Sequence, residues 1–155
     1  MIRRVAFEVA QMSAAPAAEP VLASAAPRPV GAYPHARRAG PLLFLSGIGP
    51  RSPVDNSIPG NRYDETGRLV GYDIEAQCHS VFANVDAVLA AAGARRDQLI
   101  DITVFLTHMT DDFATMNRLY AEQYGAVAAC RTTVEISALP TPIAIELKCI
   151  AYLGD

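Results

Sequence analysis

The sequence predicts an α/β (α+β) fold in which a mixed β-sheet carries two helices packed on one of its faces. Two segments, 73–92 and 111–124, have apolar residues at helical spacing. A third segment, 99–107, alternates apolar and polar residues, and two further β-rich runs, 131–139 and 144–153, close the chain. The predicted order is strand or hairpin, helix, strand, helix, strand and strand, which is typical of one two-layer domain.

The composition fits one domain with an ordinary hydrophobic core. The chain has 155 residues, of which 51% are hydrophobic and 19% charged, and its formal net charge is -3. These values exclude a disordered charged protein, and we expect neither nucleic acid nor a membrane as a partner. No apolar stretch in the sequence approaches the roughly 20 residues that span a bilayer.

The first 29 residues differ from the rest because they are rich in alanine and proline. We predict a poorly ordered extension over 1–29 and a folded domain over 30–155. Arg3 and Arg4 precede a mildly apolar run, as in a secretory signal, but Glu8 interrupts that run. We therefore expect a cytoplasmic protein, with export as the alternative.

The folded domain is predicted to open with a strand and a long loop. The short apolar run 42–46 is bounded by glycine and proline and indicates a buried strand. Residues 50–71 are dense in Pro, Gly, Asn and Asp, which indicates a long loop with a small hairpin at the sequence DETG. Long ordered loops in compact domains are often functional.

The segment 73–92 is the clearest helix, because Asp73 can cap its start and Gly93 can end it. Its apolar stripe consists of Ile74, Cys78, Val81, Phe82, Val85, Val88, Leu89 and Ala92. The second helix is predicted to start at Asp111 or Asp112. It is expected to bury Phe113, Met116, Leu119 and Tyr120.

Three strands complete the predicted sheet. The strand 99–107 is expected to place one set of apolar side chains on one side, namely Ile100, Ile102, Val104 and Leu106. The last two strands are joined by the tight link Pro140-Thr141-Pro142, which predicts that they are neighbours. Since both helices cover one face, the other face also needs a cover, and we expect a homo-oligomer whose sheets face one another.

Motifs for common catalytic and metal sites are absent from the sequence, which lacks GxSxG, GxxxxGK[ST], HExxH and a GxGxxG after a strand. The scattered histidines make a metal site improbable; His79 and His108 are expected on the surface. His35, close before two arginines, is a candidate for substrate binding. Three cysteines without a CxxC pair favour a reducing compartment, and Cys130 is a weak candidate nucleophile.

Two charged residues stand where a buried strand would not usually place them. Arg131 opens the run RTTVEI, and Glu146 lies between Ile145 and Leu147 in the last run. From the pattern alone, a surface ion pair is one interpretation and a functional pair is the other.

Several motifs together resemble the reactive-intermediate deaminase (Rid, or YjgF) family. They are, in order, GAYPHARRAGPLLFLSG, NVDAVLAAAGA, LIDITVFLTHMTDDFATMNRLYAEQYG, RTTVEISALP and AIELKCIAY, and they cover about residues 31–153. Within that family, YPH-x-RR, PVDNSIPGN, RTTV and IELKCIAY are most similar to the 2-aminomuconate deaminase branch.

This resemblance implies a chorismate-mutase-like fold assembled as a homotrimer with three clefts between subunits. It also implies hydrolysis of a small carboxylate-bearing enamine or imine to a 2-oxo acid and ammonia, without metal or organic cofactor. The family's carboxylate-binding arginine falls on Arg131, and the acidic residue that positions water falls on Glu146. The expected substrate-binding residues are Arg131, Tyr33, Ser46, Gly47, Asn117, Thr133 and, from its own setting, His35. Thr133 stands where many members have a cysteine.

A muconate-type substrate has a second carboxylate to hold. The sequence offers positive groups in or beside loops for this role, namely His35, Arg37, Arg38, Arg51 and Arg62. Three alternatives stay open: a general scavenger of small imines such as 2-aminoacrylate, an RNA-acting protein, and a non-catalytic ligand-binding trimer.

Overall fold

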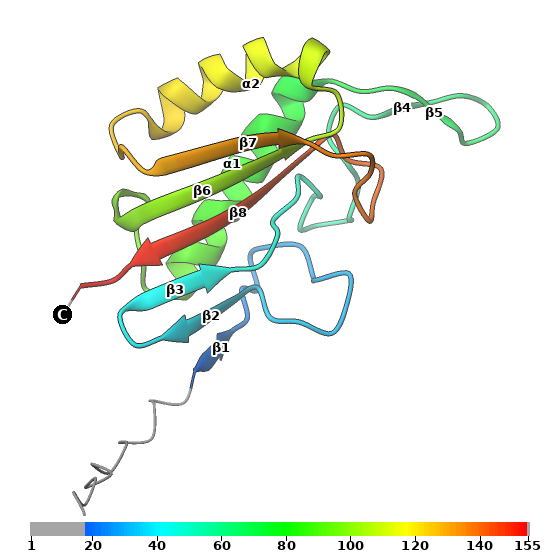
Figure 1. Ribbon diagram of the computed structural model, residues 1–155. Coiled ribbons are helices and arrows are strands. Elements are labelled where there is room, and N and C mark those ends of the chain that lie inside the picture. The colour runs from blue at the N-terminus through cyan, green and yellow to red at the C-terminus, as the bar shows by residue number, and fades with distance from the viewer. Residues whose placement is uncertain (1–17, 155) are drawn as a thin grey trace, which may run out of the picture.

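The computed structural model describes residues 18–154, which form a mixed sheet, a hairpin and two helices (Figure 1). The sheet consists of β1 (Glu19–Val21), β2 (Ala36–Ala39), β3 (Leu42–Leu45), β6 (Leu99–Leu106), β7 (Cys130–Glu135) and β8 (Ile145–Tyr152). The remaining elements are the hairpin β4 (Arg62–Tyr63) and β5 (Leu69–Gly71), α1 (Ile74–Ala91), a 3-10 turn (Arg96–Gln98) and α2 (Met109–Tyr124). The predicted α+β class, with both helices on one face of the sheet, is confirmed.

The order of the last strands differs from the prediction. The sheet runs β1-β2-β3-β8-β6-β7, and all neighbours are antiparallel except β6 and β7. The prediction that β7 and β8 are neighbours is wrong, because β6 lies between them. After β6 the chain passes through α2 and enters β7, which runs parallel to β6. The proline-bearing link then crosses over to β8, which lies between β6 and β3.

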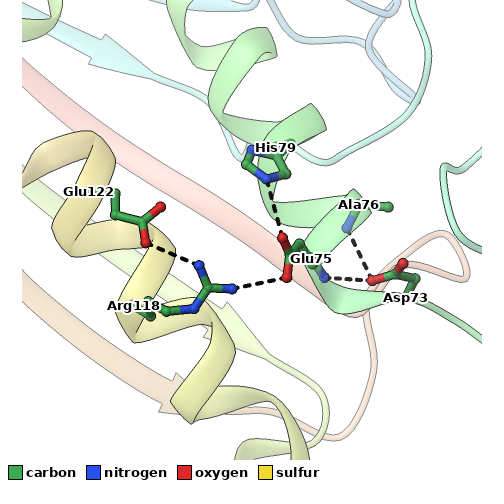
Figure 2. Close-up of polar contacts among 6 residues, drawn as sticks. All are labelled: Asp73, Glu75, Ala76, His79, Arg118 and Glu122. Atoms are coloured by element: carbon green, nitrogen blue, oxygen red, sulfur yellow. Dashed lines mark hydrogen bonds and ion pairs between the residues drawn. The ribbon is translucent and has the colours of Figure 1, made fainter.

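The helices begin and end close to the predicted residues. Asp73 caps α1, since its carboxylate accepts hydrogen bonds from the backbone N–H groups of Glu75 and Ala76 at 2.9 and 3.2 Å (Figure 2). The second helix starts before the predicted aspartates. The backbone N–H of Met109 donates to the carboxylate of Glu135 at 2.6 Å. The cap of α2 is therefore a residue of β7, which a local sequence pattern cannot predict.

Exposed charged side chains connect the two helices on their outer side. Arg118 of α2 donates to Glu75 of α1 at 2.9 Å and to Glu122 at 3.0 Å, while His79 Nε2 lies 3.8 Å from Glu75 (Figure 2). Such exposed pairs contribute little to stability. His79 is exposed on α1, as predicted.

The core lies between the helices and the facing side of the sheet. Each strand alternates, so β8 buries Ile145, Leu147, Cys149 and Ala151 beneath the helices. Two predicted core residues are corrected. Ile100 is 45% exposed, because a bulge between Leu99 and Asp101 turns Leu99 inward in its place. Phe113 is 38% exposed at the margin of the buried stripe of α2.

The packed domain starts earlier than the predicted residue 30. β1 pairs with β2, and Ala23 and Ala26 are buried in the core. The segment therefore extends the sheet by one strand, although its alanines and prolines gave no periodic signal. The part of the predicted extension over 1–17 lies outside the described residues.

The long loop is anchored to α1 by buried amides. Gln77 is fully buried; its Nε2 donates to Asn61 at 2.9 Å, and its Oε1 accepts from the backbone N–H of Ala144 at 2.8 Å. Asn61 in turn donates to the Pro142 carbonyl at 2.8 Å. The predicted hairpin at DETG is confirmed, since β4 and β5 flank those residues.

We predict that Gln77→Leu lowers the free energy of unfolding by about 1–3 kcal/mol, because it leaves the buried Ala144 N–H without a partner. The measurement is urea unfolding at one fixed protein concentration. His79→Leu, an exposed change on the same helix, should stay within about 0.5 kcal/mol of the parent. An equally small effect of Gln77→Leu would contradict the proposed anchor.

Candidate active site

Arg131 and Glu146 lie on opposite faces of the sheet. Arg131 pairs with Ile102, which pairs with Cys149, and both of these side chains are buried beneath the helices. Glu146 pairs with Phe105 on the face away from the helices. Side chains at register partners share a face, and successive residues alternate. A single chain therefore presents two separate groups of predicted site residues.

The first group surrounds Glu146. Gly47 is held beside Glu146 because the neighbouring Ile48 exchanges backbone hydrogen bonds with Leu147, at 2.8 and 2.9 Å. A solvent-open hollow of about 310 Å³ adjoins the carboxylate, and Tyr33 and Arg51 are among the residues that line it. Tyr33, Gly47 and Glu146 thus line one hollow.

The Glu146 carboxylate leaves no room for a side chain at position 47. A Cβ there would stand 2.7 Å from the carboxyl carbon of Glu146 and would overlap one of its oxygens. Any larger side chain would therefore displace Glu146 from the hollow.

The Glu146 carboxyl is electrostatically unusual. Burial raises its pKa, and no hydrogen bond within residues 18–154 supports its charged form. A carboxyl with a raised pKa holds a proton more readily than an ordinary carboxylate and can both accept and return one.

The second group surrounds Arg131 on β7, the last strand of the sheet. The guanidinium lies over the ring of Tyr120 of α2, 4.6 Å from the ring centre. Thr133 lies on the same face as Arg131, since it pairs with Val104 of β6, and Asn117 precedes Tyr120 by one helical turn. Arg131, Thr133 and Asn117 therefore lie on the helix side of the sheet. Glu146 lies on the opposite face, two strands away from β7.

Tyr120 is the residue that sequence reasoning missed in this group. Its predicted burial is confirmed, but nothing in the pattern indicated that an arginine covers its ring. The Tyr120 hydroxyl and the Thr133 Oγ1 are buried and have no hydrogen-bond partner among the described residues. These two polar atoms therefore remain unsatisfied within the described part of the chain.

Ser46 and His35 are engaged by their own backbone surroundings. Ser46 Oγ donates to the Pro34 carbonyl at 2.6 Å. His35 is buried, with Nδ1 3.0 Å from the Ala23 nitrogen and Nε2 3.0 Å from the Pro27 oxygen. The structure does not present the ring of His35 as a substrate ligand, because both its nitrogens already have partners.

Among the predicted positive groups, Arg51 is the one that lines the Glu146 hollow. Arg37 and Arg38 lie on β2 and donate to the backbone carbonyls of Ala18 and Gly40, and Arg62 lies on the hairpin. None of these three lines the hollow beside Glu146.

The cysteines offer no nucleophile at either group. Cys78 and Cys149 are buried, and burial raises the pKa of each thiol to about 12. Cys130 is exposed and turns away from Arg131, because the two are adjacent on one strand. Within residues 18–154, no group of three His, Cys, Asp or Glu side chains is placed to hold a metal ion.

Comparison with known proteins decides the family. The sequence model of the family described as Endoribonuclease L-PSP matches residues 23–153. The chain belongs to the L-PSP family. The resemblance to Rid proteins is confirmed at this level, and the L-PSP match begins at residue 23, after β1 and before the predicted residue 30.

Relatives of this L-PSP chain include a RutC family protein of Pyrococcus horikoshii, 39% identical over 134 residues, which are 86% of this chain and 97% of the relative. The chloroplastic Reactive Intermediate Deaminase A of Arabidopsis thaliana is 36% identical over 87% of this chain and 66% of its own. The crystal structure of E. coli TdcF with bound serine has a TM-score of 0.73 at 28% identity, covering 86% of this chain and 98% of TdcF.

Neither α1 nor α2, the two α-helices within residues 18–154, has the length and apolar character that a bilayer span requires. The 2-aminomuconate branch stays a prediction.

We predict that Glu146→Gln stabilises the isolated subunit, kept apart from other copies by dilution, at neutral pH. The folded state holds the Glu146 proton more tightly than the unfolded chain, so the parent loses stability as pH rises from about 4.3 through the folded pKa. Glu146→Gln removes this titration, so the difference in free energy of unfolding between variant and parent should vanish below about pH 4. Urea unfolding between pH 4 and pH 8 measures this difference, with the exposed Glu65→Gln as control. A variant that is less stable at pH 7 would contradict the assignment.

Proposed function

We propose that the protein is a cofactor-independent deaminase that hydrolyses enamine or imine acids to a 2-oxo acid and ammonia. The observation that carries the proposal is the Glu146 carboxyl, which burial holds at a raised pKa beside the hollow at Gly47. The similarity to a relative named Reactive Intermediate Deaminase A supports the same chemistry. We place this activity in the cytoplasm.

The site requires a second copy of the chain. Because Arg131 and Glu146 occupy opposite faces of one sheet, Arg131 of one subunit meets Glu146 of the next in a homotrimer. Among residues 18–154, β7 has a sheet neighbour on one side only. The face that carries Glu146 also exposes Phe44 and Tyr152, at 39% and 46%. An uncovered edge and exposed aromatic residues are features that assembly would cover.

In the assembled site, Arg131 binds the substrate carboxylate by paired, charge-assisted hydrogen bonds. The enamine gains a proton at carbon to give the imine. Water then adds to the C=N carbon while Glu146 accepts one water proton and passes it to the nitrogen, which gives the amino alcohol. Glu146 next accepts the hydroxyl proton of the amino alcohol and delivers it to the nitrogen, so that the C–N bond breaks and ammonia leaves as the C=O bond forms. Water and imine are consumed, and a 2-oxo acid and ammonia are formed.

The finer proposal is that the substrate is 2-aminomuconate or a related dicarboxylate. Arg51 supports it, because a second cation lies in the same hollow as Glu146. Two of its five N–H donors are used, toward Asn56 and the Arg28 carbonyl, so others remain for a distal carboxylate. A scavenger of small imines would not need this group.

We predict that Glu146→Gln lowers kcat by about 10²- to 10⁴-fold, because proton transfer to and from water is lost. Arg131→Lys should raise KM and lower kcat/KM by about 10- to 100-fold, since a bidentate contact is lost. Ammonia release from enamines generated in situ is the measurement. Glu65→Gln and Arg68→Lys change exposed residues and are the matched controls. Both should release ammonia with the kcat and KM of the parent.

The same assay decides the substrate class. Faster turnover of 2-aminomuconate than of 2-aminoacrylate supports the dicarboxylate, and comparable turnover supports the scavenger. Absence of ammonia release from both would refute the deaminase and favour a binding protein. Cleavage of a labelled RNA that Glu146→Gln abolishes would instead favour the RNA-acting alternative.

A further inference from the structure

Arg51 is held by neutral partners only. It donates to the Arg28 carbonyl at 2.6 Å and to the side-chain oxygen of Asn56 at 3.0 Å, and it forms no ion pair within residues 18–154. Other arginines of this part of the chain do pair with Asp or Glu, namely Arg68, Arg95, Arg96 and Arg118. The charge of Arg51 is therefore not neutralised by the groups that hold its side chain in place.

Glu146 does not neutralise this charge either. Arg51 and Glu146 line the same hollow, but no ion pair joins them among the described residues. An adjacent guanidinium would lower the pKa of a carboxyl, whereas burial raises the pKa of Glu146. The cation and the carboxyl therefore stand apart, so that they can act on different ends of one substrate.

Asn56 is placed by a tight turn over residues 52–57. The Ser52 N–H donates to the Ser57 carbonyl at 2.7 Å, and the Asn56 N–H donates to the Ser52 carbonyl at 3.0 Å. Asn56 has a φ of 62°, in the left-handed region that Asn and Asp enter more readily than most residues. The turn directs the amide of Asn56 to Arg51, and an aspartate fits the same backbone conformation.

The acidic residue of this turn is engaged elsewhere. Asp55 Oδ1 accepts hydrogen bonds from the Ser57 Oγ at 2.7 Å and from the Ser57 N–H at 3.0 Å. The hydrogen bond from the Ser57 side chain is the main cause that lowers the pKa of Asp55, which stays charged at neutral pH. The turn thus contains a carboxylate but sets an uncharged amide against the guanidinium of Arg51.

The backbone at Arg51 is fixed from α1. Asn84 is buried, and its Nδ2 donates to the carbonyls of Gly49 and Arg51 at 2.9 Å each. Ser80 donates to the Pro50 carbonyl at 2.7 Å. Because the backbone is held in this way, the direction of the Arg51 side chain depends on its two acceptors.

We propose that Asn56 is a positioning residue that selects dicarboxylate substrates, because its amide orients Arg51 without neutralising it. The remaining N–H groups and the charge of Arg51 are then kept for the distal carboxylate of the substrate. The inference rests on the proposed function for the place of Arg51 in the site. It adds the requirement that the side chain facing Arg51 be uncharged.

The test measures binding of two unreactive acids of equal length, hexanedioate and hexanoate, by calorimetry on the full-length protein at low ionic strength. Hexanedioate should bind the parent about tenfold or more tightly, because only its second carboxylate can pair with Arg51. Asn56→Asp pairs Arg51 within the chain and should reduce this preference about threefold or more. Val54→Asp adds the same charge to the same turn at a side chain that is 91% exposed, and it should retain the preference.

Kinetics distinguish a positioning role from a merely structural one. Asn56→Asp should raise the KM for 2-aminomuconate about threefold or more and raise the KM for 2-aminoacrylate far less. Asn56→Gly keeps the left-handed turn and removes the acceptor without adding a charge, so its effect should fall between those of the parent and Asn56→Asp. Equal weakening of both substrates by Asn56→Asp would show a structural role and overturn the inference.

The outcomes separate this inference from the proposed function. Equal binding of both acids by the parent overturns the inference even if ammonia is released from enamines. A preference that Asn56→Asp retains, or that Val54→Asp loses to the same extent, also overturns it. A preference that Asn56→Asp alone reduces supports the inference even if no enamine is hydrolysed, in which case the deaminase proposal alone fails.

Discussion

The alternation of side chains along a β-strand is the constraint on which the site depends. Arg131 and Glu146 sit on strands separated by β6, and their register places one beneath the helices and the other on the opposite face. No rotation of these side chains alone brings them into one cavity within a chain. The chemistry proposed for them therefore requires an assembly in which one face of a subunit meets the edge of another.

Each half of the proposed site holds groups that the single chain leaves unsatisfied. Glu146 is held partly out of water without a hydrogen bond within the described residues, and this raises its pKa. The buried hydroxyls of Tyr120 and Thr133 beside Arg131 also lack partners there. Buried polar groups without partners reduce stability, and their retention is typical of sites that keep these groups for a ligand or a neighbouring subunit.

Sequence reasoning succeeded where the signal is local. The α1 stripe, its Asp73 cap and the alternation of β8 follow from short-range periodicity, and these elements fix the fold class. It failed where a distant partner decides. The strand order depends on α2 as a crossover, and the start of α2 depends on Glu135. The surroundings of His35 depend on Ala23, which lies in a segment with no periodic signal. Arg131 and Glu146 were predictable as candidates, but their opposite faces were not, because β6 separates their strands.

The most direct measurement of the central claim mixes two inactive proteins. Arg131→Ala and Glu146→Gln subunits are dissociated, combined in equal amounts and reassembled, and ammonia release is compared with that of each protein treated alone. If the site is shared between subunits, random assembly joins an intact Arg131 to an intact Glu146 at about one quarter of the clefts, and activity should return toward that fraction of the parent value. Reassembled mixtures that remain as inactive as the separate variants would contradict a shared site.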